Sequence, residues 1–376
     1  MATMALERRE GGAPLFSENP LKLMVFGMSA QGGCTMTAAE GTLKAEWEES
    51  VEVARLVEEA GIEGIVPYVR WKGMQGDTNP GQRNFETTTW AAGLAAKTER
   101  TQIFTTVLMP SVHPVMFAKQ VATLDHISGG RAAANVVAGW FSREFRLFGS
   151  KVMLEHDERY VYADEWMTIC RRLWTEQEPF THDGRYLQVY DADSDPKPLQ
   201  QPHPILMGAG SSPAGRAFAA KHCDINFAVA PDLEIAAALI KDCKEYARRE
   251  FGREVMVFGM GSIVCRDTEA EVKRYVDYYV HEKGDWVAAT TMTDEVGLHS
   301  GSIPKEDLDR MKALIIGGMG AIPLHGTPEQ VVDGMVKMAA AGFDGITLNW
   351  PDYAAGLRQF KDELLPLCVQ AGLRKG

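Results

Sequence analysis

Short apolar, strand-like runs alternate with amphipathic helical stretches along almost the whole of this 376-residue chain. Such alternation is typical of repeated strand–helix units, whose strands lie parallel in one sheet. The predicted strands are 21–28, 65–69, 101–108, 132–138, 205–208, 224–229, 255–264 and 345–348. Eight strands, each followed by a helix, predict the α/β class and a single (β/α)₈ TIM barrel with insertions, a fold that runs from about 200 to over 400 residues.

A doubly wound open sheet is the alternative arrangement of the same elements. Its dinucleotide-binding form carries GxGxxG after the first strand, but the Gly-Ala-Gly run of this chain comes only at 208–210. The run 182–189 predicts a hairpin excursion from the barrel, and Gly284–Gly320, rich in small residues, predicts a long loop that acts as a lid. We therefore expect an N-terminal extension over residues 1–20 and one barrel domain over 21–376.

Composition excludes some partners and favours one compartment. The formal net charge is −12, which argues against a nucleic-acid or anionic-membrane partner. The six cysteines are scattered and form no CxxC pair, which suits free thiols in a reducing compartment. The first 20 residues contain no apolar run and so predict neither a signal peptide nor a membrane span. We expect a cytoplasmic protein.

The chemistry of a barrel enzyme lies at the carboxyl ends of its strands. Here these positions are polar, aromatic and rich in amides, and the nine histidines show neither HxH nor HExxH spacing. A serine-nucleophile elbow, GxSxG, is also absent from the sequence. We expect no metal site, and the pattern favours a cradle for a flat polar cofactor over a hydrolytic centre.

A phosphate-binding segment is predicted at 208–216 (GAGSSPAGR). Ser211 and Ser212 precede a helix, and the backbone N–H groups at a helix start bind anions. Arg159 and Tyr160 of another predicted helix supply counter-charge and a hydroxyl. The same serines also fit an N-cap without any ligand, so both interpretations stay open.

Asn135 lies within a strand of small apolar residues, Ala-Ala-Asn-Val-Val. An amide is unfavourable there unless its hydrogen bonds are satisfied, by a ligand or by a buried network inside the protein. Glu144, shortly after the same strand, either serves the same pocket or lies on an exposed helical turn.

Three stretches carry a family resemblance. They are TLDHISGGRAAANVVAGWFSREF (Thr123–Phe145), LEHDERY (Leu154–Tyr160) and PILMGAGSSPAGRAFAA (Pro204–Ala220). They resemble the bacterial-luciferase-like (group C) FMNH₂-dependent monooxygenases, particularly the pyrimidine (uracil) and dimethylsulfone/alkanesulfonate branches. The likeness extends from about Leu21 to the C-terminal helix.

The resemblance implies a reaction and a set of site residues. It implies a two-component monooxygenase that receives FMNH₂ from a separate NAD(P)H:flavin reductase, uses O₂, and forms a homo-oligomer, a dimer or tetramer. Thr106 and Asn135 would then be catalytic, with Thr106 near the reactive edge of the flavin; a β-branched strand residue without a catalytic role is the alternative for Thr106. The FMN contacts fall on Val69, Arg70, Asn135, Glu144, Arg159, Tyr160 and Ser212, to which the phosphate segment adds Ser211.

The substrate is expected to be a small nitrogen heterocycle or an organosulfur compound. The segment YVRWKGMQGDTN, with Trp71, and the segment SAQGGCTM depart from both branches on the expected substrate side. We place Trp71, His113 and Trp140 on that side. A deazaflavin-dependent hydride-transfer enzyme and a non-catalytic flavin-binding protein are the alternative functions.

Overall fold

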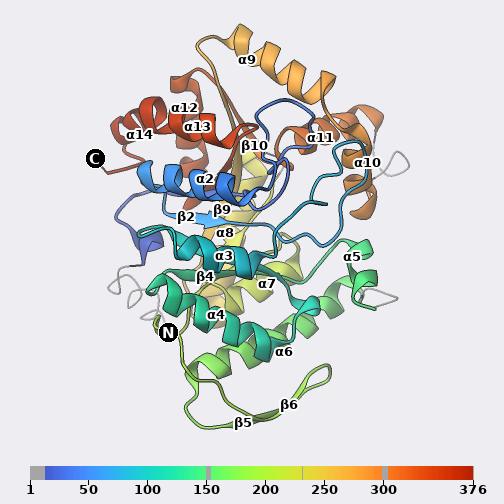
Figure 1. Ribbon diagram of the computed structural model, residues 1–376, viewed down its shortest axis with the longest axis vertical. Coiled ribbons are helices and arrows are strands. Elements are labelled where there is room, and N and C mark those ends of the chain that lie inside the picture. Colours follow the sequence, from blue (N-terminus) through green and yellow to red (C-terminus); the bar gives the residue numbers. More distant parts are fainter. Residues whose placement is uncertain (1–12, 150–153, 231, 299–303, 376) are drawn as a thin grey trace.

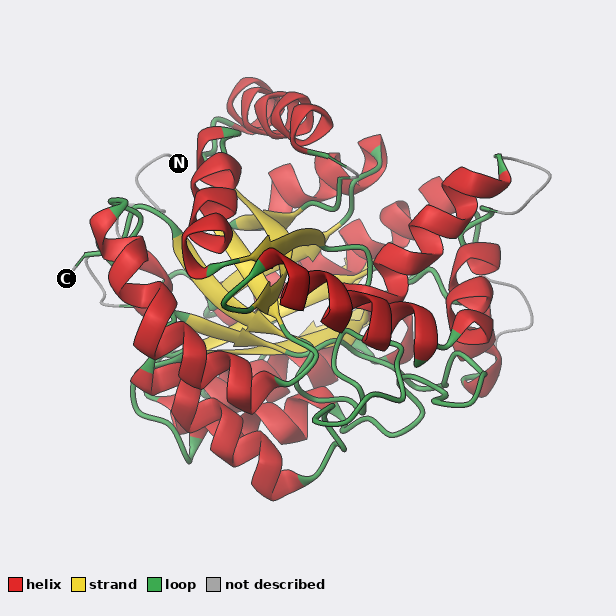
Figure 2. Ribbon diagram, turned by 90° about the horizontal axis from the view of Figure 1, so that it is seen from above, coloured by secondary structure: helices red, strands yellow, loops and turns green. Residues whose placement is uncertain are grey.

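The computed structural model describes residues 13–149, 154–230, 232–298 and 304–375, and its centre is a closed barrel of eight parallel strands (Figures 1 and 2). The ring closes because β9 pairs with β8 on one side and β11 pairs with β1 on the other. In ring order the strands are β1 (Lys22–Phe26), β2 (Gly64–Val66), β3 (Gln102–Leu108), β4 (Ala132–Val137), β7 (Ile205–Ala209), β8 (Ile225–Phe227), β9 (Met256–Cys265) and β11 (Gly345–Asn349). All eight predicted strands are confirmed, within a few residues at each end.

Helices surround the barrel on all sides in the view of Figure 2. They are α2 (Trp47–Glu59), α3 (Thr87–Ala95), α4 (Pro114–Ser128), α6 (His156–Thr175), α7 (Pro213–His222), α8 (Leu233–Phe251), α9 (Glu269–Val276), α12 (Pro328–Ala340), α13 (Tyr353–Gln359) and α14 (Leu365–Gln370). Single turns of other helix types are η1 (Pro14–Phe16), η2 (Met109–Ser111), η3 (Asp277–Glu282) and η4 (Phe360–Leu364). Among the described residues, no helix is both long and apolar enough to cross a membrane.

The strands are almost entirely apolar because both of their faces are buried, as parallel barrel strands require. Inward-pointing Phe104, Met207 and Phe258 pack with their neighbours inside the barrel, and outward-pointing residues pack beneath the helices. All six cysteines are buried and unpaired, which confirms the prediction of free thiols. Burial raises the pKa of the Cys34 thiol to about 12.

The prediction of a long loop over Gly284–Gly320 is wrong. The segment forms helices α10 (Trp286–Glu295) and α11 (Lys305–Gly318), and the unpredicted strand β10 (Ile322–Gly326) follows and pairs with the second half of β9. Asp285 caps α10 by accepting a hydrogen bond from the N–H of Ala288 at 2.9 Å. The small residues that suggested a loop are packing surfaces instead: Ala288 and Ala289 are fully buried.

The predicted excursion near 182–189 is confirmed as the antiparallel hairpin of β5 (Phe180–Asp183) and β6 (Gln188–Ala192), which extends from the bottom of the molecule in Figure 1. The carboxylate of Glu165 on α6 accepts hydrogen bonds from the N–H groups of Arg185, Tyr186 and Leu187, at 2.9 to 3.0 Å. One half-buried carboxylate of α6 therefore holds the hairpin turn in place.

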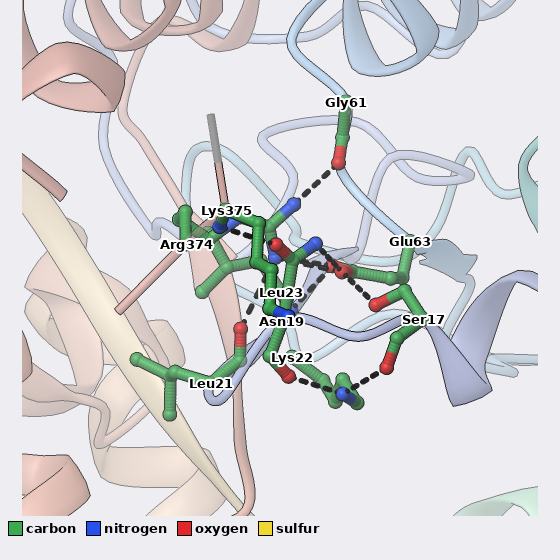
Figure 3. Close-up of polar contacts among 9 residues, drawn as sticks. All are labelled: Ser17, Asn19, Leu21, Lys22, Leu23, Gly61, Glu63, Arg374 and Lys375. Carbon is green, nitrogen blue, oxygen red and sulfur yellow. Dashed lines mark hydrogen bonds and ion pairs between the residues drawn. The ribbon is translucent and has the colours of Figure 1, made fainter. Parts of the chain in front are cut away.

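A buried ion pair between Glu63 and Arg374 links the C-terminal residues to Ser17 and Asn19 of the N-terminal segment (Figure 3). Arg374 Nη1 lies 2.7 Å from both carboxylate oxygens of Glu63, and both side chains are 3% exposed. Ser17 and Asn19 donate hydrogen bonds to the same carboxylate, at 2.7 and 2.6 Å. Nearby, Leu15 inserts its fully buried side chain into the barrel core. The described part of the predicted N-terminal extension is thus integrated into the barrel, while residues 1–12 lie outside the described ranges.

Candidate active site

A cavity of about 550 Å³ opens at the carboxyl ends of the barrel strands. Its floor is formed by residues of β1, β3, β4, β7, β8 and β9, and its sides by α5 (Ser142–Leu147), the start of α6 and the end of α10. Eight of the predicted site residues line it: Val69, Arg70, Thr106, Asn135, Trp140, Glu144, Arg159 and Tyr160. Barrel closure therefore brings together side chains that lie up to 91 positions apart in the sequence, from Val69 to Tyr160.

Thr106 and Asn135 are adjacent because β3 and β4 pair in the register that sets them opposite each other. The Thr106 hydroxyl donates to the carbonyl of Pro67 and accepts a hydrogen bond from Asn135 Nδ2 at 3.3 Å. Asn135 is 3% exposed, and its Oδ1 has no hydrogen-bond partner among the described residues. Leaving a buried acceptor unsatisfied costs about 1–3 kcal/mol, so this atom marks a place for a donor from a ligand.

Arg70 and Glu144 form an ion pair at the cavity wall. Arg70 Nη1 lies 3.4 Å from Glu144 Oε2, and the side chains are 6% and 4% exposed. The guanidinium carbon also lies 4.9 Å from the ring centre of Trp140 and 5.2 Å from that of Phe141. Burial raises the pKa of Glu144, and the Arg70 charge and the N–H groups of Trp71 and Lys72 oppose that shift. The alternative of an exposed helical turn is therefore excluded for Glu144.

The predicted phosphate segment lies at the start of α7. Ser212 is the N-cap residue and accepts a hydrogen bond from the N–H of Gly215 at 3.1 Å. A side-chain Cβ at Gly210 or Gly215 would lie within 2.8 Å of the Tyr160 hydroxyl, so this close approach requires glycine at both positions. Burial raises the pKa of Tyr160, and a hydrogen bond with Ser212 opposes the shift.

Arg159 extends from the same turn of α6 and donates to the carbonyl of Gly139 at the cavity wall. The Ser211 hydroxyl contacts the backbone of Val229, 3.2 Å from its nitrogen and 3.3 Å from its oxygen. Ser211 and Ser212 lie beside the cavity without contributing to its lining. The structure thus shows that Ser212 is an N-cap, one of the two interpretations of this segment, and that the N-cap lies next to Arg159 and the Tyr160 hydroxyl.

Of the three residues predicted on the substrate side, only one lines the cavity. Trp140 lines the cavity. Trp71 is 39% exposed and meets Phe148 edge-on, with ring centres 5.4 Å apart, although its backbone N–H donates to Glu144 at 2.6 Å. His113 is the exposed N-cap residue of α4 and accepts from the N–H of Val115. Neither Trp71 nor His113 is part of the cavity lining, so their substrate roles stay predictions.

Sequence reasoning missed most of the apolar wall. Phe26 and Phe227 stack with ring centres 5.5 Å apart, and they lie at the ends of strands whose boundaries were predicted. Counting alternate positions back from each predicted strand end would have found both. The remaining missed residues are Tyr68, Leu108, Val137, Ala138, His156, Ala209, Val229, Met260, Met292, Glu295, Val296 and Met319.

The described side chains of the site do not form a set of metal ligands. Among the residues that the structure describes, no group of three or more His, Cys, Asp or Glu side chains is arranged to hold a metal ion. The site offers an orphaned amide oxygen, a buried ion pair and a helix N-terminus around one apolar cavity. That combination suits an organic cofactor that carries an anionic group.

Comparison with known proteins identifies relatives of the whole chain. The family model for luciferase-like monooxygenases matches residues 22–345. An FMNH₂-dependent dimethylsulfone monooxygenase of Pseudomonas putida is 30% identical over 353 residues, covering 93% of this chain and 95% of that protein. The pyrimidine monooxygenase RutA of a Bradyrhizobium species is 26% identical over 371 residues, covering 94% and 99%. The structure of the long-chain alkane monooxygenase LadA superposes with a TM-score of 0.83 at 21% identity, covering 96% of this chain and 93% of that chain.

Proposed function

Because the chain belongs to the luciferase-like monooxygenase family, we propose that it is a two-component monooxygenase: it takes reduced FMN from a separate NAD(P)H:flavin reductase and uses O₂ to oxidise a small organic molecule. The proposal extends to this chain the cofactor that its dimethylsulfone relative carries in its name. We place the expected substrate among nitrogen heterocycles and organosulfur compounds, the classes on which the two named relatives act.

The observation that carries the proposal is the orphaned Oδ1 of Asn135 in a cavity of the right size. The cavity of about 550 Å³ is within the range of organic-ligand pockets, about 300–1,000 Å³. Flavins carry ring N–H groups that would donate to this buried oxygen. Thr106, next to Asn135, fixes the amide orientation because its hydroxyl accepts from Asn135 Nδ2.

The flavin phosphate would lie at the start of α7. Backbone N–H groups at a helix N-terminus bind anions, and the helix dipole adds positive potential there. Tyr160 supplies a hydroxyl and Arg159 a positive charge from the neighbouring α6, and both residues line the cavity. The absence of a Cβ at Gly210 and Gly215 keeps the backbone close to Tyr160. The donor set therefore fits the phosphate of FMN.

When bound, reduced FMN supplies the electrons and the site at which oxygen is activated. The protein's own part is to hold the ring, to orient it and to exclude water. The Thr106 hydroxyl uses its proton on Pro67 and one lone pair on Asn135, which leaves its second lone pair to accept a hydrogen bond at the cavity. The Arg70–Glu144 ion pair would give the cofactor a nearly neutral section of cavity wall.

The lid predicted for 284–320 becomes, in this proposal, the helix α10. The cavity is lined by Met292 and Glu295 of α10 and by Val296, which follows the helix. A helix and not a loop therefore covers this side of the site. Glu295 accepts hydrogen bonds from the N–H and the hydroxyl of Ser142 on α5, at 3.1 and 2.9 Å. This contact would hold α10 closed against the other side of the cavity.

Equilibrium binding of three cofactors tests the proposal. The protein is titrated anaerobically with reduced FMN, reduced riboflavin and a reduced deazaflavin, and binding is followed by flavin and tryptophan fluorescence. We expect reduced FMN to bind tightest, and riboflavin to bind more weakly because it lacks the phosphate. Preference for the deazaflavin would contradict the proposal and support a hydride-transfer enzyme.

A further inference from the structure

The charged side chains that line the cavity are already engaged by the protein. Arg70 is paired with Glu144, and Arg159 donates to a backbone carbonyl. His156 contacts its neighbour Asp157 at 2.7 Å. In the proposed function the flavin phosphate takes Arg159, and no further cation lines the cavity among the described residues. An anionic substrate would therefore find no charge partner of its own.

Glu295 adds a carboxylate to this wall. Its side chain is 14% exposed and is held by Ser142, and Arg143 Nε lies 3.5 Å from its other oxygen. Arg143 is 33% exposed and does not line the cavity, so solvent screens its charge more strongly than that of Glu295. Of this ion pair, only the carboxylate faces the cavity, and its counter-ion lies outside the lining.

The rest of the wall is apolar and polarisable. Met260, Met292 and Met319 come from three separate elements, and the stacked rings of Phe26 and Phe227 lie on the barrel side. Thioethers and aromatic rings make favourable contacts with rings and with sulfur, and they offer no strong hydrogen bond. The surroundings favour a molecule with an apolar ring or chain.

We propose that the substrate is a neutral molecule with an apolar ring or chain, and that Glu295 is the specificity-determining residue that rejects anionic analogues such as sulfonates. The inference rests on the proposed function, because it assigns Arg159 and the start of α7 to the flavin phosphate. Two carboxylates, Glu144 and Glu295, line the cavity; Arg70, the counter-ion of Glu144, lines it too, whereas Arg143, the counter-ion of Glu295, does not. Like charges at close range in a partly buried site repel strongly enough for a preference of at least tenfold.

A matched pair of ligands tests this proposal on the protein loaded anaerobically with reduced FMN, the cofactor of the proposed function. Methyl phenyl sulfone and benzenesulfonate share the ring and the S(=O)₂ group, and they differ in a methyl group against a charged oxygen. Both dissociation constants are measured by the change in flavin absorbance and in tryptophan fluorescence, to which Trp140 of the cavity lining contributes. We expect the sulfone to bind at least tenfold tighter than the sulfonate.

Two variants then assign the preference to a residue. Glu295→Gln keeps an acceptor for Ser142 and removes the charge, and it should reduce the sulfone preference at least fivefold. Asp294→Asn removes the same charge from the exposed neighbouring position on α10 and should leave the preference unchanged. FMN binding by each variant shows that its site is intact.

The outcomes separate this inference from the proposed function. Failure of the wild-type protein to bind FMN would overturn both. FMN binding with equal affinity for the two ligands, with tighter binding of the sulfonate, or with binding of neither, would overturn the inference alone. An unchanged preference in Glu295→Gln would overturn the role of Glu295.

Discussion

The buried pair of Glu63 and Arg374 allows a quantitative prediction about stability. Replacing Arg374 by Met keeps most of the apolar stem and removes the charge that faces both oxygens of Glu63 at 2.7 Å. The variant also removes the donor to the carbonyl of Leu21, at 3.1 Å, and the donor to that of Gly61. Glu63 keeps its hydrogen bonds from Ser17 and Asn19, but its buried negative charge is left without a counter-ion.

Removing one partner of a buried pair costs about 3–5 kcal/mol, because the remaining charge is uncompensated. The exposed fraction of 3% for both side chains allows little relief by solvent, so we expect a loss of about 4 kcal/mol for Arg374→Met. With an unfolding entropy of about 2.1 cal/mol/K per residue, the melting temperature of a 376-residue chain should fall by about 5 °C. Urea unfolding followed by tryptophan fluorescence gives the free energy, and thermal unfolding gives the shift.

Two further variants separate the pair from general damage to the C-terminus. Lys375→Met breaks the exposed pair with Glu18, in which the two side chains are 61% and 85% exposed, and should leave the free energy of unfolding unchanged within experimental error. Glu63→Gln combined with Arg374→Met removes both charges and should recover part of the loss. A free energy of unfolding for Arg374→Met within 1 kcal/mol of wild type would refute the reasoning.

Four other predictions follow from the site and its surroundings. Asn135→Ala should weaken binding of reduced FMN about fivefold, the value of one neutral hydrogen bond, and an unchanged dissociation constant would argue against the ring contact. Tyr160→Phe should weaken FMN but leave riboflavin unaffected, and an equal loss for both ligands would move Tyr160 away from the phosphate. Burial lowers the pKa of His325 from 6.5 to about 4, so the unfolded chain takes up a proton first as the pH falls. The free energy of unfolding should therefore fall as the pH drops from 6.5 toward 4. In His325→Leu, the decrease between pH 7 and pH 5 should be about 2 kcal/mol smaller than in the wild-type protein. An equal decrease in the variant and in the wild type would exclude His325 as the cause. Chymotrypsin cleavage within 284–298, which contains Trp286, Met292 and Leu298, should slow when FMN binds, and an unchanged rate would count against closure by α10.

The sequence predicted the barrel strands well because a strand buried on both faces has an unmistakable apolar pattern. The strand at 132–137 and its neighbour at 102–108 are nearly continuous apolar and β-branched residues, so their existence and ends were visible. Once the strand ends were known, the barrel rule placed Thr106 and Asn135 at the site. Their register, which makes them direct neighbours, is a property of the pairing and was not visible in either segment alone.

The prediction of a long loop over 284–320 was wrong for a physical reason. Its threonines and glycines have low helix propensity, and tertiary packing overrides that propensity. The hydroxyls of Thr290 and Thr291 donate to carbonyls four residues earlier, and Gly318 lies against Ser262 and Asn349 where a Cβ would clash. Glu295 was missed because its position on a helix over the cavity depends on those contacts.

The most direct test of the central claim is the reaction of the protein-bound reduced cofactor with oxygen. Reduced FMN is mixed anaerobically with the protein and then with O₂ in a stopped-flow instrument, and flavin absorbance and oxygen uptake are followed. The account predicts a time course that differs from that of free reduced FMN and saturates with protein concentration. Reoxidation at the rate seen in buffer, together with binding of a reduced deazaflavin, would contradict it.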